Sequence, residues 1–277
     1  MKFIISFTTS PTRIYKIKKM MNAIINQTVK PDLIILNIPK IFQRTNETYQ
    51  IPDYLNSIYD KFVINHIETD YGPATKIYPT IKYLKDNNYS LDTRVIYLDD
   101  DIVYLPKMVE SYKKRIESSL NIYNKSVLCT SGFDFIDFKI IPARQDKKKC
   151  SIVEGYGSVC VSLACFSDDF EEYFLNIIKN KDCFLSDDIT LSNYFHKKSI
   201  PCYILNTPDY SIRDIWMKGG ILEYGNQEDA LHNGANGTSN DNAKRYLSVI
   251  KYLNINKQRF FKVGFITNKL SRTVVYK

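Results

Sequence analysis

Short apolar runs alternate with segments of helical periodicity along the first part of the chain. The run at residues 2–8 (KFIISFT) stops at polar residues and a proline, which is typical of a buried strand that ends in a turn. Residues 14–27 then carry apolar side chains at the spacing of one helix face. Strands that alternate with helices indicate a parallel sheet with helices on both faces. The same criteria predict further strands at 33–38, 61–67 and 94–98 and a helix at 77–84.

The pattern becomes more mixed in the second half of the chain. A helix is expected after residue 106, up to about residue 123, and residues 133–164 resemble short β-like pieces around a charged excursion. Residues 209–240 are rich in Gly, Asn and Asp and predict a long loop, of the kind that is often functional. The remaining predicted elements are a strand at 127–130, helices at 168–179 and 186–196, and a strand at 202–205.

Length and composition fit a packed core of ordinary size. With 277 residues, 44% of them apolar, one large α/β domain is the simplest interpretation. The six cysteines are scattered without CxxC pairs, which favours reduced, mostly buried thiols over a disulfide framework or a zinc site. The first apolar stretch is too short for a signal peptide, and no window has the roughly 20 apolar residues of a membrane span. We therefore expect a soluble protein in a reducing, cytoplasmic compartment.

Positive charge is concentrated at the C-terminal end. The net charge is +8, and residues 242–277 carry nine Lys or Arg and no Asp or Glu, so residues 1–241 have a net charge of −1. Aromatic residues, among them Tyr246 and Tyr252, are interleaved with these cations. Such a segment could contact anionic lipid, nucleic acid or a phosphorylated ligand, or it could be a solvated terminal helix and strand. We treat it as a basic extension that packs on the main domain or trails from it.

Three consecutive aspartates follow the strand predicted at 94–98. In the segment VIYLDDDIVY, Asp99, Asp100 and Asp101 stand between two apolar runs. Adjacent carboxylates repel each other, and partial burial makes this costly unless a cation neutralises them or one is protonated. Ligands bind beyond the carboxyl ends of parallel strands, so we favour a divalent cation, Mg²⁺ or Mn²⁺, that takes further oxygens from a substrate phosphate. The alternative is a solvated acidic turn that caps the following helix.

Six short motifs follow one another over about residues 3–233. They are TTSPTR, DYGPATK, YLDDDIVY, EGYGSV, SDDITLS and a late LHN. In this order they resemble the motifs of nucleotide-sugar-dependent glycosyltransferases of the GT-A fold, close to glycosyltransferase family 2. The resemblance implies a GT-A-like α/β domain at 1–241 with a mostly parallel central sheet, a nucleotide-binding half at about 1–104 and an acceptor half at about 105–241. It does not cover the basic extension at 242–277.

The resemblance assigns the three aspartates to the nucleotide-sugar. It implies that Asp99 faces the ribose or the metal and that Asp101 is the direct metal ligand, while Asp100 is either a ligand instead or a residue that orients the other two. His232 matches the late histidine that completes the metal site in many GT-A enzymes, and an imidazole suits Mn²⁺ better than Mg²⁺. The residue type alone favours neither a metal ligand nor an ordinary surface histidine in a polar loop for His232. His196 is interpreted as structural.

Polar side chains at the end of the first strand are implied to recognise the base and ribose of the donor. Hydroxyl and guanidinium groups can hydrogen-bond the edge of a uracil or guanine, although Ser10-Pro11 could equally start a helix. In DYGPATK, Asp70 could accept from a pyrimidine N3–H and Lys76 could face ribose or phosphate, or both could belong to an ordinary turn. The implied recognition residues of the first strand are Thr8, Thr9, Ser10 and Arg13.

The acidic pair at the start of the helix predicted at 186–196 is implied to supply the catalytic base. Sugar transfer with inversion needs a carboxylate opposite the leaving group to take the proton of the acceptor hydroxyl. Asp188 is the first choice and Asp187 the second. The structural alternative is that Ser186 or Asp187 caps the helix.

A loop with two glycines precedes this pair in the chain. Its glycines would permit close approach to the donor sugar and the acceptor, and its tyrosine could form a stacking wall. The loop consists of Glu154, Gly155, Tyr156 and Gly157.

The expected activity is metal-dependent transfer of a sugar, with inversion. The favoured donor is a UDP-sugar, the favoured metal is Mn²⁺ ahead of Mg²⁺, and the acceptor is a hydroxyl of a glycan, protein or lipid. An alternative is a haloacid-dehalogenase-like phosphatase, because Asp99 to Val103 also fit its DxDx[TV] pattern with Asp99 as nucleophile beside Mg²⁺. That pattern usually follows the first strand, and it would leave TTSPTR and GPATK unused. A second alternative is a non-enzymatic binder of anionic partners through 242–277, where peripheral membrane contact is considered and nucleic acid is not expected.

Overall fold

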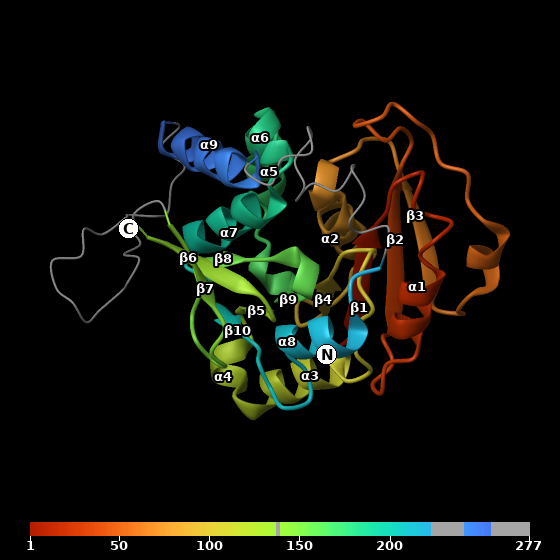
Figure 1. Ribbon diagram of the computed structural model, residues 1–277, viewed down its shortest axis with the longest axis horizontal. Helices are drawn as coiled ribbons and strands as arrows, with labels where there is room; N and C mark the ends of the chain where they lie inside the picture. Colours follow the sequence, from red (N-terminus) through yellow and green to blue (C-terminus); the bar gives the residue numbers. More distant parts are fainter. Residues whose placement is uncertain (137–138, 223–240, 256–277) are drawn as a thin grey trace, which may run out of the picture.

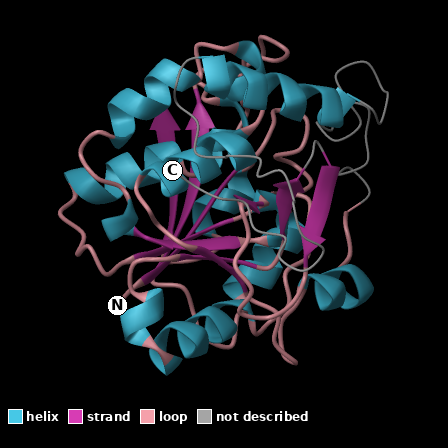
Figure 2. Ribbon diagram, turned by 90° about the vertical axis from the view of Figure 1, so that its left-hand side faces the viewer, coloured by secondary structure: helices cyan, strands magenta, loops and turns pink. Residues whose placement is uncertain are grey.

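A seven-stranded sheet forms the centre of the molecule (Figures 1 and 2). The computed structural model describes residues 1–136, 139–222 and 241–255. The strands of this sheet are β1 (Phe3–Thr8), β2 (Leu33–Pro39), β3 (Phe62–Ile67), β4 (Arg94–Tyr97), β5 (Val127–Cys129), β9 (Val159–Ser162) and β10 (Cys202–Ile204). Their order is β10-β5-β9-β4-β1-β2-β3, and every pair is parallel except those that β9 makes with β4 and β5. The mostly parallel α/β sheet predicted from the sequence is confirmed.

The inner strands of the sheet are mostly apolar because both faces of the sheet are covered. Successive side chains of a strand point to opposite faces. In β4, Val95 and Tyr97 belong to one buried cluster, whereas Ile96 and the following Leu98 belong to another. Continuous apolar runs of this kind are typical of parallel strands with helices on both sides.

Helices pack on both faces of the sheet. Buried residues of α1 (Lys18–Ile25) and α3 (Met108–Ser118) join the cluster that contains Ile96, together with α4 (Leu120–Tyr123) and α8 (Ile212–Asp214). The opposite face, with Val95, is covered by the remaining helices. These are α2 (Tyr78–Asp86), α5 (Phe170–Ile177), α6 (Lys181–Phe184), α7 (Asp187–Lys197) and α9 (Asp241–Ile255).

Three expected elements differ in detail from the structure. The helix expected up to residue 123 is broken at Ser119, whose backbone is extended, so that α3 and α4 are separate. The helix expected from residue 14 begins only at Lys18, after a series of turns. The β-like pieces at 133–164 divide between β9 and a second, antiparallel sheet of order β7-β6-β8. Its strands are β6 (Gly132–Ile136), β7 (Lys139–Ala143) and β8 (Ile152–Val153).

The beginning of the basic extension is part of the packed structure. Helix α9 lies beside α6 and α7 (Figure 1). Val249 and Leu253 are fully buried in the same cluster as Val95. This segment therefore begins with a helix that is packed on the core, whereas the sequence had left open a solvated terminal helix and strand. Residues 256–277 lie outside the part of the chain that the structure describes. Within the described ranges, no helix combines the length and the apolar character needed to cross a membrane.

Residues that the sequence assigns to the interior lie there. The pKa of the His196 imidazole is lowered to about 4 by burial, and its Nε2 contacts the carbonyl oxygen of Ser151. This agrees with a structural role. All six cysteines are free and buried, as expected: Cys129, Cys150, Cys160, Cys165, Cys183 and Cys202.

Gly72 has a conformation and a surrounding that exclude a side chain. It starts the 3₁₀ helix η2 (Gly72–Lys76) with φ +61°, and a Cβ atom there would lie 2.6 Å from the carbonyl oxygen of Phe184 in α6. The glycine thus lets η2 pass directly beneath α6.

We expect Gly72→Ala to lower the free energy of unfolding by about 2–4 kcal/mol, because left-handed backbone strain and overpacking add. Gly220→Ala is the matched control, since Gly220 has φ +83° and no described atom within 4 Å of its Cβ position. It should cost only the strain of this backbone conformation, about 1–3 kcal/mol. Urea denaturation of both variants measures the difference, and equal losses would contradict the proposed clash with Phe184.

Candidate active site

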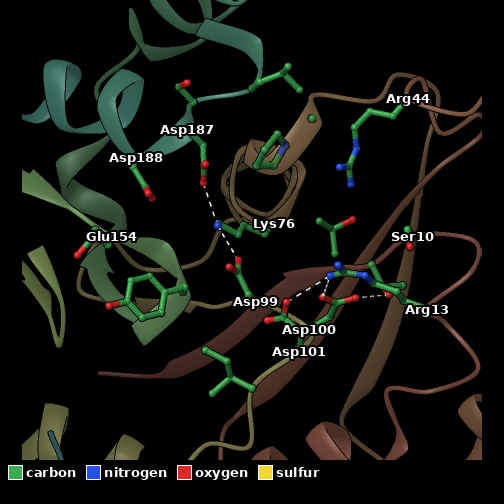
Figure 3. A pocket seen from close by; sticks show the side chains of 18 of the residues that line it. Ser10, Arg13, Arg44, Lys76, Asp99, Asp100, Asp101, Glu154, Asp187 and Asp188 are labelled. Atoms are coloured by element: carbon green, nitrogen blue, oxygen red, sulfur yellow. Dashed lines mark hydrogen bonds and ion pairs between the residues drawn. The ribbon is translucent and has the colours of Figure 1, made fainter. Parts of the chain in front are cut away.

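A cavity of about 430 Å³ opens at the edge of the sheet where the parallel strands end (Figure 3). Residues that follow β1, β3 and β4 reach it directly. Because β9 is antiparallel to β4, the start of β9 lies at this same edge, and the EGYG loop before it reaches the cavity from the opposite side. One antiparallel strand thus brings the two halves of the predicted site together.

The three aspartates after β4 are each paired with a cation. Asp99 Oδ1 accepts from Lys76 Nζ at 2.7 Å. Asp100 accepts from the Thr9 hydroxyl at 2.5 Å and from Arg13 Nη1 at 3.1 Å, and Asp101 lies 3.3 Å from the same Arg13 nitrogen. Arg13 therefore holds Asp100 and Asp101 (Figure 3), and Thr9 holds Asp100 as well.

These cations do not fully compensate the aspartates. Burial raises the pKa of Asp100, while Arg13 and Thr9 oppose this shift. Burial, and then the charges of Asp100 and Asp99, raise the pKa of Asp101 to about 7. Among the described residues that line the cavity, seven are carboxylic acids and four are Lys or Arg, an excess of three potential negative charges. An additional cation would stabilise this group of carboxylates.

Lys76 connects the aspartates to the acidic pair on α7. Its Nζ lies 2.7 Å from Asp99 and 2.9 Å from Asp187 Oδ2, and its side chain is only 5% exposed. Burial opposes the charge of this ammonium group, but Asp187 and Asp99 outweigh burial and raise the pKa of Lys76 above its ordinary value. The sequence predicted that Lys76 faces ribose or phosphate. In the structure it bridges two carboxylates at the wall of the cavity.

Asp188 lies beside this ion pair and has different partners. Its Oδ1 accepts from the backbone N–H of Gly155 at 2.8 Å, and its Oδ2 accepts from the Tyr246 hydroxyl at 3.3 Å. Burial, followed by the charge of Asp187, raises the pKa of Asp188 well above its ordinary range. A raised pKa strengthens the affinity of a carboxylate for a proton, and such perturbed groups in clefts are frequently functional.

The residues predicted at the end of β1 line the cavity, but two of their hydroxyls are already bound. Thr8 donates to the carbonyl oxygen of Asn37, and Thr9 donates to Asp100. Ser10 contacts the Thr12 hydroxyl at 3.1 Å. Their assignment to base recognition remains a prediction.

Asp70 builds the turn that precedes η2. Its Oδ1 accepts from the Gly72 N–H at 2.8 Å and from the Thr75 hydroxyl at 3.0 Å, and its Oδ2 accepts from the Gln43 N–H at 2.9 Å. The turn interpretation of DYGPATK is thus present in the structure. Asp70 also lines the cavity, so its recognition of a pyrimidine stays a prediction.

The EGYG loop reaches the cavity through Glu154 and Tyr156. Its glycines are closely surrounded by protein side chains. A Cβ on Gly155 would lie 2.5 Å from Lys76 Nζ, and one on Gly157 would lie 2.5 Å from the Thr130 hydroxyl. The glycines therefore make room for these two side chains, and the close approach to the donor sugar and the acceptor stays a prediction.

The capping interpretation of the acidic pair is wrong. Ser186 occupies the N-cap position of α7, but no side chain caps the helix there. The Ser186 hydroxyl instead accepts from Arg245 Nε at 3.1 Å, and Asp187 pairs with Lys76. Competition from these tertiary partners replaces the local capping bond.

Several residues that the sequence analysis did not assign to the site line the cavity, among them Arg44, Trp216, Arg245 and Tyr246. Arg44 stands in a stretch without periodicity, and nothing in its surroundings signals a site. Trp216 is the sole tryptophan of the chain, and its rarity was the only available signal. His232 lies outside the described residues.

The carboxylates fit a divalent cation only in part. Their oxygens are ligands that Mg²⁺ and Mn²⁺ accept, and Asp101 with its raised pKa would gain from such a cation. The described residues, however, include no group of three or more side chains placed to hold a metal. Asp99 and Asp101 could supply one or two ligands, and Mg²⁺ sites commonly complete their shell with water and substrate phosphate.

Comparison with known proteins reveals likeness only to solved structures. No family model and no curated protein match the chain. S. aureus TarS 1–349 in complex with UDP has a TM-score of 0.45 and 14% identity, over 76% of this chain and 59% of that chain. The Francisella tularensis 2-C-methyl-D-erythritol 4-phosphate cytidylyltransferase has a TM-score of 0.41 and 13% identity, over 75% of this chain and 91% of that chain. Scores this low carry no argument about fold family or activity, and the mostly parallel α/β sheet is established by the strand pairing of the structure itself.

We expect Lys76→Met to lower the free energy of unfolding by about 3 kcal/mol, since it removes one partner of a buried ion pair and leaves the carboxylates uncompensated. Adding Asp187→Asn should recover part of this loss, because one unpaired charge disappears. Urea denaturation of the two single variants and the double variant measures the coupling. Lys82→Met is the control: its ammonium group pairs with Glu171 at the surface and should contribute less than about 1 kcal/mol. If the losses of unfolding free energy in the two single variants simply add up in the double variant, the ion pair between Lys76 and Asp187 does not contribute to stability.

Proposed function

We propose that the protein is a metal-dependent glycosyltransferase that moves a sugar from a nucleotide-sugar, with a UDP-sugar as the favoured donor, to an acceptor hydroxyl. The observation that carries the proposal is the shared cavity: the aspartates after β4 and the acidic pair at the start of α7 both line it, and Lys76 connects them. Sugar transfer needs these two functions, a site for the diphosphate and a base for the acceptor, next to each other.

The charge of the cavity supports a cation on the donor side. A diphosphate carries negative charge, and the excess of carboxylates around the cavity would repel it. Asp101 and Asp99 would hold the divalent cation, which would neutralise the diphosphate and stabilise the charge of the leaving nucleotide. Mn²⁺ is favoured over Mg²⁺. Arg13 fixes the aspartates from the side of β1, where the nucleoside would lie.

Asp188 is the proposed base. Asp187 is engaged with the ammonium group of Lys76, whereas Asp188 accepts only neutral donors, the Gly155 N–H and the Tyr246 hydroxyl, among the interactions described above. Two carboxylates in different environments can take different roles. The acceptor hydroxyl would give its proton to Asp188 while its oxygen attacks the anomeric carbon and the bond to the diphosphate breaks, which inverts the configuration.

The acceptor would enter on the side of Glu154. Tyr156 and Trp216 line the cavity there, with ring centroids 5.9 Å apart at 61°. Aromatic rings offer flat apolar surfaces beside polar groups, which suits the mixed character of a sugar ring. A glycan, or a glycosylated protein or lipid, is the acceptor class that fits.

Calorimetric titration with UDP, GDP and CDP, with and without MnCl₂, tests the donor side. We expect UDP to bind in Mn²⁺, and Asp101→Ala to weaken this binding at least about tenfold, because a metal ligand is lost. Asp168→Ala, at an exposed carboxylate, should bind like the wild type. If the Asp101→Ala protein binds UDP as tightly as the wild type in Mn²⁺, Asp101 is not a ligand of the metal. Turnover of p-nitrophenyl phosphate that depends on Asp99 would instead favour the phosphatase alternative.

Asp188→Asn tests the base. The amide keeps the size of the side chain but cannot accept a proton, so UDP binding should persist while transfer falls by roughly 10²–10⁴-fold. Asp187→Asn should reduce transfer less and stability more, since it removes a partner of Lys76. Product formation from UDP-glucose, UDP-galactose and UDP-N-acetylglucosamine with a glycan panel measures transfer, and NMR gives the anomeric configuration. Near-normal turnover of Asp188→Asn, or retention of configuration, would overturn the assignment.

A further inference from the structure

Helix α9 lies outside the motifs that suggested the activity, yet two consecutive residues of it line the cavity. Arg245 Nε donates to the hydroxyl of Ser186, and the Tyr246 hydroxyl donates to Asp188 Oδ2. Both partners stand at the start of α7, on either side of Asp187. A segment that the sequence presents as a basic extension thus contacts the acidic pair directly.

The position of Tyr246 is fixed from two directions. Its ring stacks on Phe133 of β6, with centroids 6.0 Å apart and ring planes 15° from parallel. One and two turns further along α9, Val249 and Leu253 are fully buried in the core, and Ser248 donates to the carboxylate of Asp182 on α6. The hydroxyl therefore comes from a rigidly packed helix, which is the kind of support that a precisely held site requires.

The hydroxyl remains a donor at neutral pH. Burial, followed by the charge of Asp188, raises the pKa of Tyr246 well above its ordinary value. With the Gly155 N–H on Oδ1 and the Tyr246 hydroxyl on Oδ2, each oxygen of Asp188 has one donor. Two donors on different oxygens fix the plane of the carboxylate.

We propose that Tyr246 is a positioning residue for Asp188, so that α9 is part of the catalytic site and the transferase domain extends past residue 241. The inference rests on the proposed function, in which Asp188 is the base. The Tyr246 hydroxyl orients the carboxylate and stabilises its ionised form through a hydrogen bond to a charged acceptor. The charged and titratable groups that face Asp188 from the surrounding elements are Asp187, Lys76, Glu154, Tyr97, Arg245 and Tyr246 itself.

Tyr246→Phe removes the hydroxyl and keeps the ring stacked on Phe133. Titration of the protein alone, followed by NMR of ¹³C-labelled aspartate carboxyl groups with Asp188→Asn to assign the resonance, gives the midpoint of Asp188. We expect this midpoint to rise by about 0.5–1 unit in Tyr246→Phe, a modest shift because the two oxygens are 3.3 Å apart. Tyr252→Phe, on the same helix but not lining the cavity, should leave it unchanged. An unchanged midpoint in folded Tyr246→Phe overturns the proposal.

A second measurement needs no variant at position 246. In the wild type, the Cζ resonance of Tyr246 should titrate with the same midpoint as Asp188, and a resonance that stays constant through that midpoint overturns the proposal even if Tyr246→Phe does not fold. Neither titration uses a nucleotide or a sugar. A failure of UDP to bind would therefore count against the donor, whereas a failure of the titrations would count against the contact between Tyr246 and Asp188.

Discussion

The ammonium group of Lys76 lies between two carboxylates that come from distant parts of the chain, Asp99 after β4 and Asp187 at the start of α7. Three aspartates in a row and an acidic pair could not face one small cavity without such a cation, because burial and mutual repulsion both disfavour their ionised forms. Two glycines allow Lys76 to reach this position between the carboxylates. Gly72 lets η2 pass beneath α6, and Gly155 leaves space for the ammonium group itself.

Lys76 also makes the two members of the acidic pair different. It compensates the charge of Asp187, while Asp188 is held by a backbone N–H and a tyrosine hydroxyl and has a raised pKa because of burial and its neighbour. Adjacent carboxylates with unequal partners are a common basis for separate roles in catalysis. This asymmetry is the feature of the site on which the proposed role of Asp188 as general base rests. The position of Tyr246 argues against a protein that only binds anions through the basic extension. Tyr246 belongs to that extension, yet it lines the cavity.

The sequence by itself determined the class of the fold and most of the polar residues of the site. Continuous apolar runs separated by amphipathic segments predict a parallel sheet between helices, because only strands covered on both faces can be apolar throughout. The rule that ligands bind beyond the carboxyl ends of parallel strands then placed Asp99 to Asp101 at a cavity before any contact was known. Local patterns carry this information because they reflect which faces of each element are buried.

Only the tertiary structure decided how these residues pair. The antiparallel direction of β9 and the packing of α9 on α6 and α7 depend on contacts between segments far apart in the chain, and no local periodicity encodes them. For the same reason Ser186 and Asp187 looked like helix caps, although Arg245 and Lys76 are their actual partners. The sequence suggested ribose or phosphate as the partner of Lys76 and gave no sign of its two carboxylate partners, and it placed Tyr246 in a basic extension. From the sequence, only the nearby hydrogen-bond partners of a side chain can be foreseen. Folding adds partners from distant segments, and these compete with the nearby ones. In a buried site that contains both charges, the distant partners bind more strongly.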